Sequence, residues 1–319
     1  MKITIYNETS RLDTDSIATI GFFDGVHRGH RFLLRQLCDE ARQRQLSSMV
    51  VTFDRHPRQV LRSDFQPQML GTLEEKLALL AQTGVDHCVV LPFREQLASL
   101  SAQAFMQRVL KEQLGVKALM IGYDNRFGHK RQEGFDDYVQ FGKEMGMDVL
   151  PSKPLYVGGI GISSSVVRSF LLEGEVGMAA HCLGYPYTLA GEVVKGFHVG
   201  TGMGFPTANL QPKPADKVIP APGVYAVMVT ADGRQWQGMM NIGNRPTFEG
   251  TALSLETHIF DFEGNLYGEQ LAVSFISRLR SERKFRSASE LTAQLMEDAR
   301  EAKEQIARWQ ESGDAIFAK

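Results

Sequence analysis

The sequence has few cysteines and no long apolar run. Its three cysteines, Cys38, Cys88 and Cys182, are odd in number and widely spaced. They fit neither a disulfide framework nor a zinc-binding pattern, so we expect a reducing compartment, the cytoplasm. No apolar stretch approaches the roughly 18 residues of a membrane-spanning helix. The first residues lack the apolar core and cleavage site of a signal peptide, so no secretion signal is expected.

The sequence also lacks an excess of charge of either sign. The formal net charge is -2, from 35 Lys and Arg against 37 Asp and Glu. This balance gives no electrostatic reason to expect a nucleic-acid or membrane partner, although a nucleotide site needs only local positive charge. A length of 319 residues with 43% hydrophobic content favours two soluble domains. We therefore expect no nucleic-acid or membrane partner, and the sequence carries no indication of an oligomeric state.

The first half alternates short apolar runs with segments of helical periodicity. Strands are predicted at 17–20, 49–53, 88–91, 118–121 and 148–150, and helices at 29–44, 73–81, 102–114 and 135–145. Thr72 and Glu75 fit a capping box at the start of the second helix. The alternation predicts a Rossmann-like parallel sheet with helices on both faces and with ligands beyond the carboxyl ends of its strands.

The second half has a different pattern. Helices are predicted at about 164–172 and to about 183, and the segment Gly184–Tyr187 then suggests a boundary between domains at 1–185 and 186–319. Strands are predicted beyond it at 189–194, 224–230, 235–241, 254–260 and 271–275. Short strands joined by turns such as Asp232-Gly233 predict an antiparallel barrel or sandwich. A charged helix at about 288–310 ends the chain.

The first candidate site is the string Gly21-Phe-Phe-Asp24-Gly25-Val-His27-Arg-Gly29-His30. It follows a predicted strand and enters a helix, where Gly25 and Gly29 let the backbone approach a ligand closely. Free amides at a helix start and two imidazoles form a site for phosphate. Nucleotidyl transfer needs such donors, because negative charge grows on the leaving pyrophosphate. A chance occurrence of the short His-x-Gly-His pair, or a metal site on the two imidazoles, are the alternatives.

Two further segments of the first half add polar groups. Ser163, Ser164 and Arg168 lie at the start of a predicted helix, so hydroxyls, free amides and a guanidinium can converge on one anion. Asp124, Asn125 and Arg126 follow a predicted strand and suit a second substrate. Taken alone, the first segment is a serine-capped surface helix and the second a polar turn.

The second candidate site is Gly204-Phe-Pro206-Thr207-Ala-Asn209, at the end of a glycine-rich stretch. No Gly-Lys-Ser/Thr sequence closes it, so it is not a Walker A loop, but it can bend around phosphates. The Thr207 hydroxyl and the Asn209 side-chain carbonyl are suitable ligands for Mg²⁺. Taken alone, the segment is a turn that enters a strand, and Glu256 is a solvent-facing strand residue.

Over nearly its whole length the chain resembles the bifunctional riboflavin kinase/FMN adenylyltransferases of bacteria. The histidine string and Ser163-Ser164-Ser165-Val-Val-Arg168 match the family's ATP-phosphate motifs. The resemblance implies that the first half transfers AMP from ATP to FMN, giving FAD, with His27 and His30 at the phosphates. Phe22 replaces a residue that is often polar in the family, and Asn125 replaces a phenylalanine.

The resemblance also assigns the second half, as a riboflavin kinase that makes FMN. It implies that Thr207 and Asn209 bind Mg²⁺ and ATP phosphates and that Glu256, before Leu266-Tyr267-Gly268, is the catalytic base. It places the segment from Leu279 to Phe285, with Arg280, near the flavin. Thr201 stands where the family has arginine, and Lys195, His198 or a rearranged loop could supply the charge.

We thus predict an enzyme that converts riboflavin to FMN and then FMN to FAD, with ATP and Mg²⁺ in both steps. One alternative is a chain that retains the adenylyltransferase alone. Another is a flavin or nucleotide sensor without turnover, which Glu256 and the two histidines disfavour because a sensor needs no catalytic base.

Overall fold

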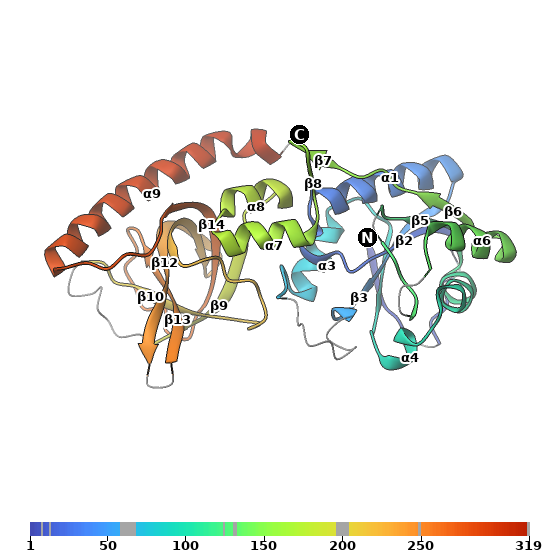
Figure 1. Cartoon of the computed structure of the whole chain (residues 1–319), viewed down its shortest axis with the longest axis horizontal. Helices are drawn as coiled ribbons and strands as arrows, with labels where there is room; N and C mark the ends of the chain where they lie inside the picture. Colours follow the sequence, from blue (N-terminus) through green and yellow to red (C-terminus); the bar gives the residue numbers. More distant parts are fainter. Residues whose placement is uncertain are drawn as a thin grey trace. The chain divides into compact units, whose positions relative to one another are not determined.

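A computed structural model of the chain describes residues 1–7, 9–12, 14–57, 68–123, 125–129, 133–195, 204–247 and 250–317, without the side chains of 245–252 and 312–317. The chain forms two compact units, Met1–Ile162 and Ser163–Lys319 (Figure 1). Among the described residues, no helix has both the length and the apolar character needed to cross a membrane.

The first unit is built on a six-stranded sheet whose neighbouring strands all run parallel, in the order β1-β4-β3-β2-β5-β6. The strands are β1 (Lys2–Ile5), β2 (Ser16–Ile20), β3 (Ser47–Phe53), β4 (His87–Leu91), β5 (Val116–Ile121) and β6 (Asp148–Pro151). The predicted parallel sheet is confirmed, and β1 is an additional strand at its edge. A small antiparallel hairpin, β7 (Tyr156–Val157) and β8 (Ile160–Gly161), follows.

Helices cover both faces of this sheet, as its buried strands require. They are α1 (Arg28–Arg44), α3 (Leu73–Ala81), α4 (Glu95–Ala98), α5 (Ala102–Ala104), the π-helix η2 (Phe105–Gln113) and α6 (Phe135–Met145). Alternate residues of β2 and β3 face opposite cores, so Ile17 and Val50 pack with α1 while Ile20 and Val51 pack with η2. The predicted capping box of Thr72 and Glu75 is present at α3.

The second unit is a closed antiparallel barrel in the order β10-β13-β12-β11-β14-β9, which confirms the predicted barrel. Its strands are β9 (Thr188–Val194), β10 (Ala208–Pro212), β11 (Gly223–Ala231), β12 (Arg234–Thr247), β13 (Gly250–Ile259) and β14 (Gln270–Arg280). β10 was not among the predicted strands, although the alternative interpretation of the Gly204–Asn209 segment was a turn that enters a strand. This strand carries Asn209 and closes the barrel between β9 and β13.

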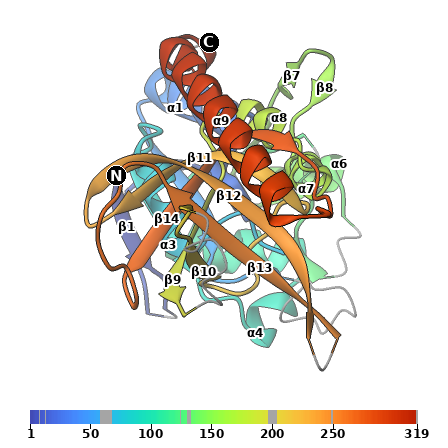
Figure 2. The same cartoon turned by 90° about the vertical axis from the view of Figure 1, so that its left-hand side faces the viewer.

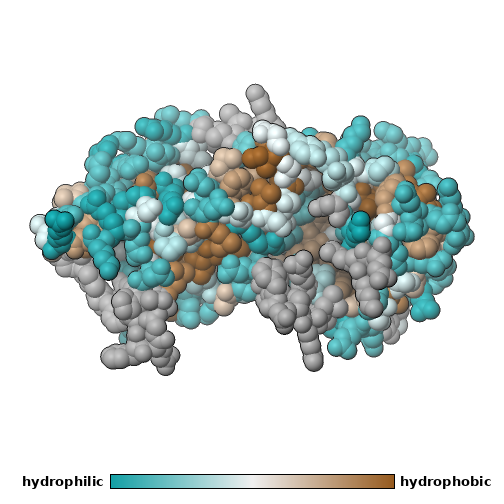
Figure 3. All heavy atoms as spheres, viewed as in Figure 1, coloured by the Kyte–Doolittle hydropathy of each residue, from teal (hydrophilic) through white to brown (hydrophobic). Residues whose placement is uncertain are grey.

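Three helices pack against the barrel. The predicted terminal helix is α9 (Ala288–Phe317), which lies along one side of the barrel in Figure 2. It buries Ala302 and Ile306 against Ala226 and Met239 of two strands. Its visible side is largely hydrophilic in Figure 3, as expected for a helix with one buried stripe. The other helices, α7 (Ser164–Glu173) and α8 (Val176–Leu183), precede β9 and belong to this unit.

The two compact units therefore divide between Ile162 and Ser163, upstream of the boundary predicted between residues 185 and 186. The N–H of Ala221 donates to the carbonyl of Leu171, and the Arg278 guanidinium donates to the carbonyls of Glu173 and Pro222. These bonds tie α7 to the barrel. The boundary at 185/186 stays a prediction, which fragments of the chain can test.

Candidate active sites

The histidine string forms a tight turn between β2 and α1. After the buried strand β2, a single turn of 3-10 helix, η1 (Asp24–Val26), leads into α1. Phe23, Gly25 and Val26 have φ of 56°, 72° and 35°, all in the left-handed region. This conformation suits glycine and strains the other two, so surrounding contacts must hold the turn in place.

The two imidazoles stack face to face at the start of α1. Their centroids are 3.6 Å apart with an interplanar angle of 16°. His27 is the N-cap, and its Nδ1 accepts the N–H of His30 at 3.2 Å. Neutral His27 therefore carries its proton on Nε2, as a hydrogen-bond donor. Burial, the charge on His27 and the charge on Lys76 lower the pKa of His30 well below its usual value. His30 is thus neutral at pH 7.

Gly29 is required by the close approach of its neighbours. A methyl group there would lie 3.0 Å from the carbonyl oxygen of Ile162 and 3.1 Å from the ring of His27. The glycine thus lets the chain around Ile162 pass directly over the first turn of α1. The following residue along the chain is Ser163, where the second unit begins.

Several buried groups hold the turn from its other side. Both carboxylate oxygens of Asp24 accept the N–H of Leu70 at 3.1 Å, and Arg31 donates to the carbonyl of Val26. Thr52 and Lys76 both donate to the carbonyl of Phe22 at 3.1 Å. The sequence analysis missed Lys76. A signal was available, because Lys76 falls on the same helical stripe as Leu73, Leu77 and Leu80.

The residues after β5 lie at the same edge of the sheet. The amide nitrogen of Asn125 donates to the carbonyl of Ile20, at the end of β2. This hydrogen bond from its side chain holds Asn125 against the end of β2. Arg126 is exposed, and Asp124 lies outside the described residues.

The serine segment begins the second unit. Ser163 is the N-cap of α7, and its hydroxyl accepts the N–H of Val166 at 3.3 Å. Ser164 and Arg168 lie in the first turns of this helix and are half-buried. The predicted helix start with its serine cap is confirmed, and the expected convergence on one phosphate with the histidine turn stays a prediction.

In the second unit, three polar side chains form a row across adjacent strands. Glu256 of β13 pairs with Asn209 of β10 on one side and with Asn241 of β12 on the other. Paired residues of neighbouring strands share a face of the sheet. Met239, two residues before Asn241, packs in the cluster beneath α9, so the row lies on the outer face of the barrel. All three side chains are half-buried.

His258 fixes the Phe-Pro-Thr segment beside this row. It lies two residues after Glu256 on the same face of β13, and its Nδ1 donates to the carbonyl of Pro206 at 2.8 Å. The ring of Phe205 packs edge-on against it at 5.0 Å. Burial lowers the pKa of His258, although the bond to Pro206 and the charge of Asp261 oppose that shift. Thr207, which follows at once, is half-buried, whereas Gly204 is exposed with φ of 79°.

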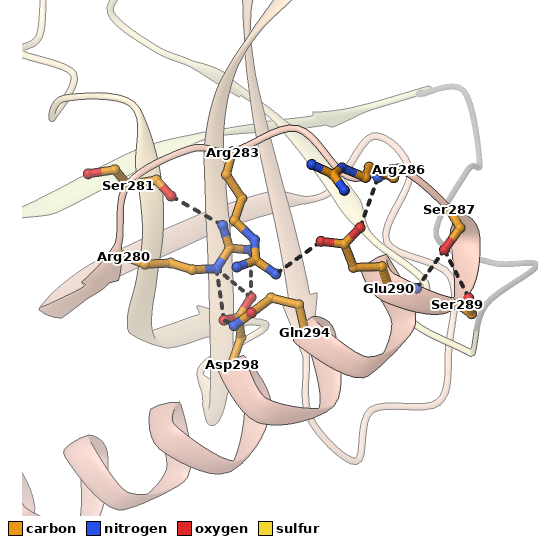
Figure 4. Close-up of polar contacts among 9 residues, drawn as sticks. All are labelled: Arg280, Ser281, Arg283, Arg286, Ser287, Ser289, Glu290, Gln294 and Asp298. Carbon is orange, nitrogen blue, oxygen red and sulfur yellow. Dashed lines mark hydrogen bonds and ion pairs between the residues drawn. The ribbon is translucent and has the colours of Figure 1, made fainter.

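The segment after β14 is anchored to α9 by a buried ion pair. The Arg280 guanidinium donates to both carboxylate oxygens of Asp298, at 2.7 to 3.1 Å, and Gln294 donates to the same carboxylate (Figure 4). Asp298 is 1% exposed. The guanidinium groups of Arg280 and Arg283 lie 5.6 and 4.6 Å from the centroid of the Phe285 ring. Arg280 thus has a structural role that the sequence did not indicate.

The far end of this segment reaches the Glu256 row. A side chain at Gly243 would meet Glu282 Oε1 at 2.7 Å and Asn241 Nδ2 at 3.1 Å. Glu282 therefore lies over β12, next to Asn241. The described residues contain no cluster of three His, Cys, Asp or Glu side chains able to hold a metal ion. An ion at Thr207 and Asn209 would need water and phosphate oxygens to complete its coordination.

Comparison with known proteins decides the family. A family model described as FAD synthetase matches residues 9–166, and one described as riboflavin kinase matches residues 183–306. The bifunctional riboflavin kinase/FMN adenylyltransferase of Escherichia coli strain K12 is 39% identical over 94% of this chain and 96% of its own length. The chain belongs to the bifunctional riboflavin kinase/FMN adenylyltransferase family. The relative from Pseudomonas fluorescens is 38% identical over 90% of this chain and 92% of its own.

A solved structure extends the likeness to the fold of the whole chain. The macrolide-efflux protein of Streptococcus pneumoniae, as that structure is described, has a TM-score of 0.85 and 31% identity over 95% of this chain and 99% of its own. The FAD synthetase match covers the histidine turn and ends past Ser164. The riboflavin kinase match covers the barrel and most of α9. Each candidate site thus falls within the match expected for its chemistry, except Arg168, which lies just past the end of the FAD synthetase match.

Proposed function

We propose that this enzyme phosphorylates riboflavin with ATP, giving FMN and ADP, and then transfers AMP from a second ATP to FMN, giving FAD and pyrophosphate. The main support is that two family models, each for one of these activities, match successive parts of the chain. The chain also aligns with a bifunctional relative over 94% of its length. Retention of one activity alone is not favoured, because the polar groups of both sites are present.

For AMP transfer, we assign the histidine turn to the ATP phosphates. The phosphate of FMN attacks the α-phosphorus, and charge develops on the oxygen that leaves with pyrophosphate. His27, with its Nε2–H, and His30 are donors for that charge, together with the positive end of the α1 dipole. Asp24, Gly25 and Gly29 shape the turn. Asp124, Asn125 and Arg126 belong to the same proposed substrate edge.

Ser163, Ser164 and Arg168 complete the proposed phosphate site. The N-terminus of α7 offers the positive end of the helix dipole, and Arg168 offers a guanidinium one turn further along the helix. Ser163 is covalently joined to Ile162, which lies against Gly29, and this supports the assignment.

For riboflavin phosphorylation, we assign Glu256 as the general base. Its carboxylate would take the proton from the ribityl hydroxyl as that oxygen attacks the γ-phosphorus of ATP. The strand register that sets Glu256 between Asn209 and Asn241 supports this role, because the sheet fixes its position. Arg280, Phe285 and the loop between them are assigned to the flavin, and Gly204 to the ATP phosphates.

Mg²⁺ is part of this proposal. Thr207 and Asn209 provide two neutral oxygen ligands beside the Glu256 carboxylate, a donor set that suits a hard cation keeping several waters. When bound, the ion would neutralise charge on the ATP phosphates. A cytoplasmic location is also proposed, on the grounds that all three cysteines are free thiols.

Three variants test the assignment of one site to each reaction. Glu256→Gln should slow FMN formation by ~10²-fold or more while AMP transfer to supplied FMN persists, because glutamine cannot accept the proton. His27→Ala and His30→Ala should abolish FAD formation from FMN and leave riboflavin phosphorylation intact. Chromatography of riboflavin, FMN and FAD after incubation with ATP and Mg²⁺ measures both reactions. Bound flavin without conversion by the wild type would instead identify a sensor.

A further inference from the structure

Lys76 is a buried lysine at the edge of the sheet where the proposed AMP-transfer site lies. It is 4% exposed, although lysine is almost never fully buried unless it is paired. Lys76 belongs to α3 and lies on the apolar stripe of that helix. The sequence gives this side chain no partner close along the chain, so its burial needs another explanation.

The ammonium group of Lys76 joins the ends of two neighbouring strands. It donates to the carbonyl of Phe22, just past β2, at 3.1 Å and to the carbonyl of Phe53, the last residue of β3, at 2.8 Å. It also lies 4.1 Å from the centroid of the Phe22 ring. Ligands of parallel sheets bind at this carboxyl edge, so Lys76 closes the base of the proposed site.

The same contacts act on the strained turn. Phe22 immediately precedes Phe23, the first of the left-handed residues that lead into His27. Its carbonyl accepts from Lys76 and also from Thr52, so two donors fix the point at which the turn leaves the strand. The segment just before α3 adds a further hydrogen bond, from the N–H of Leu70 to the carboxylate of Asp24. Together these bonds connect α3 to the turn in front of both histidines.

The charge of Lys76 reaches the site as well. The ammonium acts on His30, whose Nδ1 is buried with no hydrogen-bond partner among the described residues. The titratable groups that act on Lys76 are Asp24, Cys88 and Asp54, and burial lowers the pKa of Lys76 to about 8. At pH 7 the side chain is therefore mostly cationic. A cation at this position attracts the triphosphate and opposes protonation of His30.

We propose that Lys76 is a positioning residue for AMP transfer, which sets the histidine turn by tying β2 to β3 and adds positive charge to the phosphate site. This inference rests on the proposed function of the first unit and names a residue that its motifs do not include. Lys76 acts through Phe22 and His30 and needs no contact with substrate.

The test uses the full chain with Lys76→Met, Lys76→Arg and Thr52→Val. Lys76→Met removes both hydrogen bonds and the charge, and FMN adenylylation should slow by about 10- to 100-fold, as expected for lost bonds from a charged donor. Thr52→Val removes one neutral bond to the same Phe22 carbonyl and keeps the cation, so we expect less than about a fivefold loss. Lys76→Arg should recover most of the rate. Riboflavin phosphorylation should stay at the wild-type rate in all three.

An NMR titration of the His30 imidazole shows whether Lys76 acts on the site through its charge or only supports the fold. The pKa of His30 should rise in Lys76→Met, because a nearby positive charge is lost, and stay in place in Thr52→Val. A folded Lys76→Met protein with wild-type FAD formation would overturn the inference. So would a slowed variant in which the His30 pKa does not move, because Lys76 would then only support the fold.

Amide hydrogen exchange in β2 and β3 checks that the first unit is folded. If Lys76→Met fails this check, Lys76→Arg decides: retention of the rate within about tenfold supports the inference, and a folded Arg variant slowed 100-fold or more overturns it. If the wild type makes no FAD from FMN, the proposed function fails, which is a different result from unequal wild-type and variant rates.

Discussion

At the scale of single residues, Gly29 shows how little room the proposed phosphate site leaves. Gly29→Ala would place a methyl group 3.0 Å from the Ile162 carbonyl and 3.1 Å from the His27 ring, so one of them must move. We expect FAD formation to fall by about tenfold or more, because displacement of positioned groups by a fraction of an ångström is costly in catalysis. The rate of AMP transfer to FMN measures this.

Gly177→Ala is a matched control for Gly29→Ala. Gly177 is likewise the second residue of a helix, α8, but nothing lies within 4 Å of its Cβ position and its φ is ordinary. Alanine should be tolerated there without loss of either activity. Equal rates for Gly29→Ala and the wild type would show that Ile162 and His27 can yield, and would remove the packing argument for this glycine.

The residues of the first site differ in how far the sequence could predict them. His27 and His30 stand in a recognisable string, and their turn is where it was expected. Lys76 was missed because a lysine in an amphipathic helix is ordinarily solvated, and its burial depends on two carbonyls brought together by the sheet. Asn125 was assigned to the substrate alone, whereas the fold also bonds it to the end of β2.

At the scale of elements, the ion pair of Arg280 and Asp298 connects the barrel to α9. Asp298→Asn removes the charge from a carboxylate that is 1% exposed and leaves Arg280 uncompensated. Breaking such a buried pair costs about 3–5 kcal/mol. We expect a lower urea midpoint for the second unit and a raised KM for riboflavin, because the segment from Ser281 to Phe285 loses its anchor. AMP transfer to FMN should be unaffected.

Glu297→Gln provides the comparison on the same helix. Glu297 is one residue earlier and also pairs with an arginine, Arg300, but both side chains are more than half exposed. Exposed pairs contribute little, so this variant should keep the wild-type midpoint and KM. Fluorescence of Trp236 and Trp309, the two tryptophans of the chain, reports on this unit alone. Equal midpoints for the two variants would contradict the role of the buried pair.

The elements that the sequence predicted are those with a strong internal pattern. The buried strands, the helix 73–81 with its capping box and the helix 135–145 agree with the structure. β1 was missed because its residues are mostly exposed and its pairing with β4 is a tertiary contact. β10 was missed because polar residues and Pro212 hide the strand pattern. The helix 102–114 exists, but from Phe105 it is a π-helix, which side-chain periodicity does not reveal.

At the scale of the whole molecule, the two compact units meet at a different residue from the domain boundary that the sequence pattern indicates. The pattern changes from helix to strand near Gly184, whereas the contacts change at Ser163. The difference concerns α7 and α8, which bury Leu171, Ala179 and Leu183 completely. It matters for function, because Ser163, Ser164 and Arg168 are assigned to AMP transfer although their helix packs with the barrel.

Two fragments, 163–319 and 187–319, distinguish the two boundaries. Both contain the whole barrel and α9, so each retains Glu256 and its neighbours. Without α7 and α8, the shorter fragment loses the apolar burial of Leu171 and Leu183, worth about 1.5–3 kcal/mol for each side chain. It also loses the bond from Arg278 to the Glu173 carbonyl. We therefore expect 163–319 to fold alone, phosphorylate riboflavin and unfold at a clearly higher urea concentration by tryptophan fluorescence. Neither fragment should make FAD, because both lack the histidine turn. Equal stability and equal phosphorylation rates would favour the boundary at 185/186 and make α7 and α8 part of the AMP-transferring half.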